Sequence, residues 1–385
     1  MRHFVLGASL LIAAASAAAA DLTPEEELVA AMDNLQIGRV NDAWIELDHL
    51  VKRQPNFRLA QLFYRELQDA RDEAPAHARN VANDPALRDL MDEARLRLES
   101  SRQPIPSGSV PDAFLQLAPS HPSAIAVDLS RARLYLLENR DGALTVVRSL
   151  YAASGKNGAG KRSAGDQRTP VGVYRLTGFI PGKQLPDLYG AGAFPTDYPN
   201  VWDQRLGKRG AGIWLHGVPS DTYARAPRSS DGCVALSNDD LVALKPFIVA
   251  GATPIVLSDG LTWTPRDKAA PERDEVLAQV EAWRAHWSAL DTDGYLKFYA
   301  SDFETDGMNK HAFAQHKYRV NAGKSRINVK LSDVDLYRYP GDEPLVLARF
   351  TQHYTSSNYT KTNDKEQFWR RAADGQWQIV KESSR

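Results

Sequence analysis

Apolar residues recur every three or four positions between Pro24 and about Ser101, and this spacing predicts helices with one buried face each. Gly38 and Pro55 interrupt the pattern and mark the turns between helices. The sequence therefore predicts a helical segment over residues 21–100. The repeating positions are Leu28, Ala31, Leu35, Ala43, Leu47, Leu50, Leu59, Phe63 and Leu67.

The first helix pair of this segment resembles a tetratricopeptide unit, because Gly38, Ala43-Trp44 and Pro55 alternate small and large residues and close with proline. Such units are stabilised by stacking on further copies, and the sequence offers only one. A helical spacer, or a cap on the next domain, is the alternative interpretation.

The period changes after residues 101–119, a stretch rich in Pro, Ser and Gly that predicts a linker. Alternating and β-branched runs on both sides of Asp141-Gly142 predict a β-hairpin. Short apolar runs near 172–180, 212–218 and 253–259 predict further strands. Residues 120–258 are therefore expected to form one mostly β domain, with a second linker over 259–272.

Residues 273–385 begin with an amphipathic helix pair and continue as a long antiparallel run of strands, an α+β order. The pattern resembles the cone-shaped domain of the nuclear transport factor 2 family. That fold serves enzymes as well as binding or dimerising modules, so a small-ligand pocket and a homodimer surface both remain open. A stripe of aromatic residues is expected to form its core: Trp283, Trp287, Tyr295, Phe298 and Tyr299.

The first twenty residues have the layout of a secretory signal: Arg2 and His3, an uncharged apolar core, then small residues. Cleavage before Asp21 would export the chain to the periplasm; an uncleaved membrane anchor is the alternative. Lys and Arg number 47 against 48 Asp and Glu, so no basic field indicates nucleic-acid binding.

The only cysteine of the 385 residues, Cys233, lies in the polar turn SSDGCVALSN. An unpaired thiol in an exported chain suggests intermolecular pairing or reactivity. A nucleophilic thiol needs a base and an exposed turn, and His216 ends an apolar strand seventeen positions earlier. No spacing of Cys, His and acids suggests a metal site, and the chemistry requires no cofactor.

These residues resemble the L,D-transpeptidase (YkuD-type) catalytic domain, whose mark is a strand ending in His-Gly, a spacer, and Ser/Thr-His-Gly-Cys before an apolar-Arg-apolar run. Here His216-Gly217 and residues 230–236 hold those places, and the stretch GDQRTPVGVYRLTG at 165–178 is also similar. Two positions depart from the motif: Asp231 stands for its histidine and Ala235 for its arginine. The branch of the family that carries a transport-factor-like domain includes L,D-carboxypeptidases.

The resemblance implies a multidomain α+β enzyme in which Cys233 attacks the third residue of a peptidoglycan tetrapeptide stem and releases D-Ala. His216 would transfer the proton, and N–H groups near Gly232 and Cys233 would meet the oxyanion. Asp231 or a backbone carbonyl is expected to orient His216. Predicted substrate-binding residues are Ser230, Asp231, Gly217, Arg225, Arg228, Tyr198 and Trp202; Tyr189 is a further candidate for the groove.

Three functions follow as hypotheses. The first is an L,D-transpeptidase that passes the acyl group to the amine of a neighbouring stem. The second is an L,D-carboxypeptidase that passes it to water and thereby alters wall shape. The third is a wall-associated scaffold whose flanking domains carry the function.

Overall fold

The computed structural model describes residues 22–72, 84–341 and 343–385. The signal predicted over residues 1–20 lies outside the described residues. The chain divides into two compact units. One holds the described residues up to Pro55 and those from Ala60 to Asp72; the other holds Asn56–Leu59 and everything from Asp84 onward.

Helices form the N-terminal segment, as the spacing predicts, and Thr23 begins the first one with a capping box to Glu26. Leu28, Leu47 and Leu50 are fully buried. A tetratricopeptide identity of this segment stays a prediction. The helices are α1 (Pro24–Gln36), α2 (Val40–Arg53), α3 (Arg58–Arg71) and, in the second unit, α4 (Pro85–Arg102).

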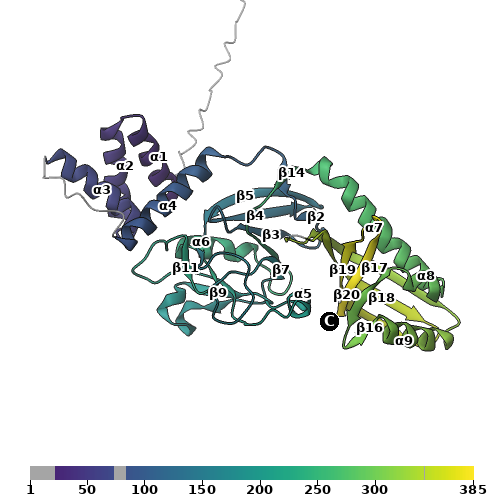
Figure 1. Ribbon diagram of the computed structural model, residues 1–385. Helices are drawn as coiled ribbons and strands as arrows, with labels where there is room; N and C mark the ends of the chain where they lie inside the picture. The colour runs from purple at the N-terminus through teal and green to yellow at the C-terminus, as the bar shows by residue number, and fades with distance from the viewer. Residues whose placement is uncertain (1–21, 73–83, 342) are drawn as a thin grey trace, which may run out of the picture. The chain divides into compact units, whose positions relative to one another are not determined.

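The middle domain is mostly β, and its main sheet has the order β5-β4-β3-β13-β7. The predicted hairpin is confirmed: Asp141 and Gly142, both with positive φ, join β4 to β5. A smaller sheet, β12-β10-β9-β8, packs with α6. Figure 1 labels its strand β9 and the helix α6. The elements are β3 (Ser123–Asp128), β4 (Arg133–Arg140), β5 (Ala143–Tyr151), β6 (Ser154–Gly155), β7 (Gly172–Arg175), β8 (Ile180–Pro181), β9 (Gly192–Pro195), α5 (Val201–Arg205), β10 (Trp214–His216), β11 (Arg228–Ser230), β12 (Val234–Ala235), α6 (Asn238–Leu244) and β13 (Pro254–Ser258).

Both predicted linkers are wrong in part, because short strands lie within them. In the first, β1 (Ser109–Pro111) pairs with β14 (Trp263–Pro265) of the second, and β2 (Phe114–Gln116) forms the edge of the C-terminal sheet. The chain therefore enters and leaves the middle domain through a β pair, and β2 hydrogen-bonds that domain's entry segment to the C-terminal sheet.

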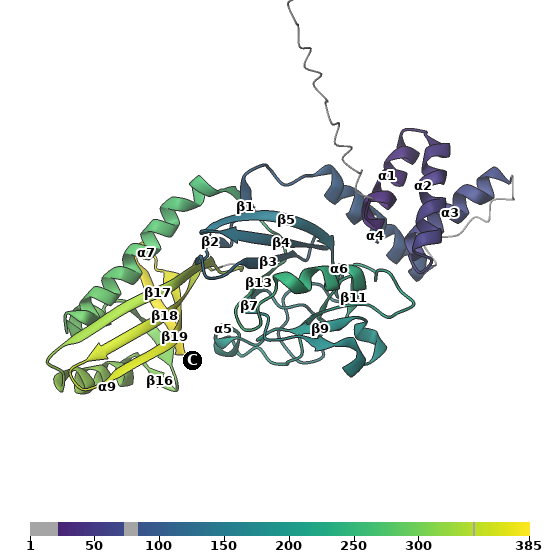
Figure 2. The same cartoon turned by 180° about the vertical axis from the view of Figure 1, so that it is seen from behind.

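The C-terminal domain is α+β, with helices on one face of a mostly antiparallel sheet of order β16-β15-β20-β19-β18-β17-β2 (Figure 2). Within this sheet, β15 and β20 are parallel. The aromatic stripe is in its core as expected, with Phe298 partly buried. One helix, α9, was not predicted. The elements are α7 (Arg266–Ser288), α8 (Thr292–Leu296), β15 (Tyr299–Thr305), β16 (Met308–Asn309), α9 (Lys310–Ala322), β17 (Ile327–Arg338), β18 (Leu345–Ser356), β19 (Thr360–Arg371) and β20 (Trp377–Ser384).

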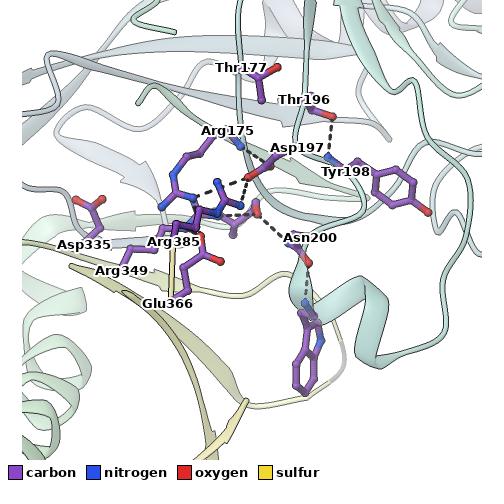
Figure 3. Close-up of polar contacts among 12 residues, drawn as sticks. Arg175, Thr177, Thr196, Asp197, Tyr198, Asn200, Asp335, Arg349, Glu366 and Arg385 are labelled. Atoms are coloured by element: carbon purple, nitrogen blue, oxygen red, sulfur yellow. Dashed lines mark hydrogen bonds and ion pairs between the residues drawn. The ribbon is translucent and has the colours of Figure 1, made fainter. Parts of the chain in front are cut away.

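A buried ion-pair cluster joins the middle and C-terminal domains (Figure 3). Arg175 of β7 lies 2.6 Å from a Glu366 oxygen, and Arg349 of β18 approaches the same oxygen at 2.9 Å. Arg385 pairs with Asp197 at 3.0 Å. Burial would raise the pKa of Glu366, but the charges of Arg349 and Arg175 hold it below its usual value.

Within the described ranges, no helix is long and apolar enough to cross a membrane.

Candidate active site

The Cys233 turn is shaped by Ser230 and requires a glycine. The Ser230 hydroxyl donates to the Cys233 carbonyl at 2.6 Å and accepts from the Gly232 N–H at 3.1 Å. Gly232 has φ +126°, and a Cβ there would lie 2.7 Å from the Arg168 carbonyl oxygen. The Ser230 hydroxyl is thus engaged within the turn, which corrects its predicted role in substrate binding. The Gly232 N–H is engaged by Ser230 as well, so it is not available to an oxyanion, contrary to the prediction. The Cys233 N–H donates to no atom of the described residues.

His216 and Cys233 belong to neighbouring segments of the small sheet. Strands β10 and β12 are parallel, with Leu215 opposite Val234 and His216 opposite Ala235. Cys233 directly precedes β12, and its sulfur is hydrogen-bonded to backbone groups of the segment that forms β10, the Gly212 carbonyl and the Trp214 N–H. The pairing therefore brings the predicted nucleophile next to the strand that His216 ends.

A backbone carbonyl orients the imidazole. His216 Nδ1 lies 2.6 Å from the Gly217 carbonyl oxygen, which fixes Nδ1 as the donor and leaves Nε2 as the basic nitrogen. Of the two predicted acceptors, the carbonyl is right and Asp231 is wrong. The thiol itself donates to the Gly212 carbonyl at 3.3 Å.

Burial keeps both groups neutral. It lowers the pKa of His216 to about 4, against the opposing hydrogen bond to Gly217. Burial also raises the pKa of the Cys233 thiol, which the Trp214 N–H and the charge of Arg225 offset only in part. The resting pair is a thiol and an imidazole rather than a thiolate and an imidazolium.

Asp231, in the motif position of histidine, holds a neighbouring loop. Its carboxylate accepts from Lys156 at 2.9 Å and from Gln167 at 3.0 Å, and its side chain is 77% exposed. The hydrogen bond from Lys156 holds the pKa of Asp231 below its usual value. The glycine-rich loop at 155–166 is therefore tied to the nucleophile turn.

Ala235, in the motif position of arginine, is buried against Ala153 and Val218. It bridges Ala153 in an antiparallel pair. The small side chain of Ala235 fits a site where two backbone segments pair closely. The position that holds arginine in the motif is therefore buried in this protein.

Of the two spacer arginines, Arg225 lies at the site. Its Nη2 donates to the Ser229 carbonyl at 2.6 Å, and its charge lowers the pKa values of both His216 and Cys233. Arg228 begins β11 with an exposed side chain. Of these two arginines, the structure thus supports Arg225 as a cation near Cys233, where Lys161 also acts.

The predicted aromatic residues of the groove are placed differently. Trp202 is buried and stacks on Phe368 of the C-terminal domain, with ring centroids 5.2 Å apart, which corrects its predicted substrate contact. Tyr198 is buried too, and its hydroxyl donates to the Arg209 carbonyl at 3.2 Å. Tyr189 is the aromatic residue beside the imidazole, with its ring centroid 5.1 Å from that of His216.

Gly217 and Asn238 hold the strand end in place. A Cβ on Gly217 would lie 2.2 Å from Asn238 Oδ1, so this glycine serves packing rather than the predicted substrate contact. Asn238 Oδ1 accepts from the Ala191 N–H at 2.8 Å and the Val218 N–H at 3.2 Å, and Nδ2 donates to the Val218 carbonyl. Sequence analysis missed Asn238, although its place just after the Ser237 N-cap of α6 is a visible signal.

No group of three or more His, Cys, Asp or Glu among the described residues is arranged to hold a metal ion. The groups at the site are a thiol, an imidazole and the backbone N–H of Cys233.

Comparison with known families agrees with this geometry. Residues 122–257 match the model of the L,D-transpeptidase catalytic domain, and residues 275–383 match that of the Cds6 C-terminal NTF2-like domain. The chain thus carries an L,D-transpeptidase catalytic domain over residues 122–257, followed by an NTF2-like domain.

Two solved structures are similar over most of their length. Bd1075 of Bdellovibrio bacteriovorus is 28% identical, with a TM-score of 0.63, covering 72% of this chain and 98% of that one. Pgp2 of Campylobacter jejuni, a helical cell shape determining protein, is 26% identical, with a TM-score of 0.60, covering 71% and 95%. No curated protein sequence shows a significant match.

Proposed function

We propose that this protein is an exported, periplasmic cysteine acyltransferase that acts on peptidoglycan tetrapeptide stems as an L,D-transpeptidase. The observation that supports the proposal is the pairing of β10, which ends at His216, with β12, which follows Cys233 directly, together with the Gly217 carbonyl that fixes the imidazole tautomer. The match to the L,D-transpeptidase catalytic domain supports the substrate class.

In the first step the Cys233 sulfur attacks the carbonyl carbon of the third stem residue, and the thiol proton passes to His216 Nε2. The Cys233 N–H stabilises the oxyanion. The bond between the third and fourth residues then breaks, and His216 returns the proton to the amine of the departing D-Ala. A thioester on Cys233 remains.

In the second step an acceptor loses a proton to His216 and attacks the thioester carbonyl, and the thiol is restored. An amine from another stem yields a crosslink, whereas water yields a tripeptide. The thiol and the imidazole are both neutral at rest. The thiol proton therefore passes to His216 only when the substrate is bound, and this transfer gives the reactive thiolate.

An L,D-carboxypeptidase is the second candidate. The observation in its favour is Ala235, where a buried methyl group stands in place of the motif's cation. Similarity to Pgp2 over nearly that whole protein also fits a role in cell shape.

Product analysis separates the candidates. Residues 21–385 are incubated with purified disaccharide-tetrapeptide, and products are identified by mass spectrometry. Dimers joined between third residues support transpeptidation, and tripeptide monomers alone support the carboxypeptidase. The Cys233→Ala variant is incubated in the same way as a control. No product from either protein, together with a cellular effect that persists in cells carrying Cys233→Ala, would favour the scaffold.

A further inference from the structure

The turn that carries Cys233 is held at both ends by one segment, residues 153–156. Before the turn, a backbone N–H of this segment donates to the Ser230 carbonyl at 2.8 Å. After the turn, Ala235 exchanges two backbone hydrogen bonds of 2.9 Å with the same segment. Residues 231–233 therefore bridge two ends that are fixed side by side, and the position of the sulfur depends on what holds this bridge.

A second segment, residues 167–169, supports the turn from another side. A Cβ on Gly232 would lie 2.7 Å from the Arg168 carbonyl oxygen, so the turn packs closely on this backbone. The Thr169 hydroxyl accepts from the Gly155 N–H at 2.9 Å, which ties the second segment to the first. The two segments thus form a joint support for the nucleophile turn.

Asp231 links the turn to both segments through its side chain. Its Oδ1 accepts from the Lys156 ammonium at 2.9 Å and from the Gln167 side-chain amide at 3.0 Å. An exposed ion pair contributes little to stability by itself. Here, however, the same oxygen joins three pieces of chain, and the neighbours Ser230 and Gly232 already contact the two supporting segments.

The thiol lies at the other end of this bridge. The Cys233 sulfur is hydrogen-bonded to the Gly212 carbonyl at 3.3 Å and to the Trp214 N–H, in the segment that forms β10. A movement of the turn away from its support would therefore change where the sulfur meets a bound carbonyl group. An error of about 1 Å in the position of a reacting atom can slow a reaction about a hundredfold.

We propose that Asp231 is a positioning residue, which clamps the nucleophile turn onto residues 153–156 and 167–169 and thereby sets the position of the Cys233 sulfur. Its effect on catalysis rests on the proposed function, whereas the clamp itself can be tested without substrate. The residue in the motif position of histidine then acts through Lys156 and Gln167, and not by contact with the stem or with His216.

The first test measures D-Ala release from disaccharide-tetrapeptide. Asp231→Ala removes both hydrogen bonds and should lower kcat about tenfold with KM unchanged, because the turn moves while the rest of the groove stays in place. Asp231→Asn keeps an acceptor oxygen and should lower kcat only about threefold. Lys156→Gln added to Asp231→Ala should cause no further loss, because the link is already broken.

A reversed pair provides the rescue. Asp231→Lys combined with Lys156→Asp restores the ion pair in the opposite sense, and the Gln167 amide can rotate to accept from the new ammonium group. The combined variant should release D-Ala faster than either single variant. Glu138→Gln, which breaks a surface ion pair with Arg140 on β4, is the matched control and should change neither kcat nor KM.

Two measurements need no substrate and separate this proposal from the proposed function. Hydrogen exchange of the Lys156 amide, which donates to Ser230, should be about fivefold faster in Asp231→Ala than in the wild type. Alkylation of the single cysteine by iodoacetamide, followed by mass spectrometry, should also be faster in this variant. The thiol is then held less firmly, and the negative charge that helps to raise its pKa is gone.

The clamp therefore predicts opposite changes in Asp231→Ala: faster alkylation and slower D-Ala release. Undiminished D-Ala release, or unchanged exchange of the Lys156 amide, would overturn the proposal. Alkylation that slows together with D-Ala release would overturn it as well, because Asp231 would then act on the reactivity of the thiol and not on its position. Faster exchange and alkylation, with a wild type that releases no D-Ala, would support the clamp and contradict the proposed function.

Discussion

Acid should destabilise the catalytic domain through His216. This side chain is 2% exposed and is held neutral, with its pKa lowered from 6.5 to about 4 by burial. An unfolded histidine binds a proton below pH 6.5, whereas the folded one does so only near pH 4. The free energy of unfolding therefore falls as the pH falls from 6.5 to 4, and above pH 6.5 the group contributes nothing to that dependence.

The size of the effect follows from the two pKa values. At about 1.36 kcal/mol for each pKa unit, the difference between 6.5 and about 4 corresponds to about 3 kcal/mol. By pH 4.5 about 2.5 kcal/mol of this stability is lost. A protein with a typical stability of about 5–15 kcal/mol would lose a large fraction of it.

The assay is urea unfolding at pH 7.5 and pH 4.5. Unfolding is monitored by hydrogen exchange of the amides at 214–236, so that the other domains do not contribute to the signal. His216→Gln serves as the comparison because its side chain does not titrate. We expect the wild type to lose about 2.5 kcal/mol more than the variant between the two pH values. Equal losses, or a His216 ring that titrates near pH 6.5 by NMR, would refute the reasoning.

Substitutions at three further positions have defined outcomes. Gly232→Ala should cost about 1–3 kcal/mol and most activity, because its φ of +126° is strained and its Cβ meets the Arg168 carbonyl; thermal melting and D-Ala release measure both. Glu366→Gln should destabilise by about 3–5 kcal/mol in denaturant unfolding, because Arg175 and Arg349 would stay buried beside a neutral partner; an unchanged midpoint would contradict the cluster's role. Asn238→Ala should lower kcat/KM about tenfold to a hundredfold, with Asn238→Asp intermediate because one acceptor oxygen remains; equal rates for both variants would argue against positioning by this amide.

The residues proposed as nucleophile and base can be picked out of the sequence because their signals are local. A lone cysteine after glycine in a polar turn, and a histidine that ends an apolar strand, are visible within a few residues. The orienting partner of His216 was left open in the sequence because a carbonyl carries no residue signature. Only the geometry of Gly217 resolves it.

Features that depend on long-range pairing were not predictable. Strands β1 and β2 have three residues each, too few for a periodic pattern, and β2 is completed by β17 more than two hundred positions later. Helix α9 buries only Phe313 and Asn321, so its apolar face is too narrow to indicate a helix.

The aromatic residues show the same limit. The spacing of Trp202 and Tyr189 says nothing about which one lies beside His216. Trp202 lies in α5 and packs on Phe368, whereas Tyr189 comes two residues before Ala191, whose N–H donates to Asn238. Both placements depend on contacts between segments distant in the sequence.

The central claim is that Cys233 is the acylated nucleophile and His216 its base. The most direct measurement is the release of D-Ala from disaccharide-tetrapeptide by the wild type, Cys233→Ala and His216→Ala, because both acceptor fates begin with that release. We predict release by the wild type, none by Cys233→Ala, and a loss of at least about a hundredfold in His216→Ala. Undiminished release by Cys233→Ala, or none by a folded wild type, would contradict the account.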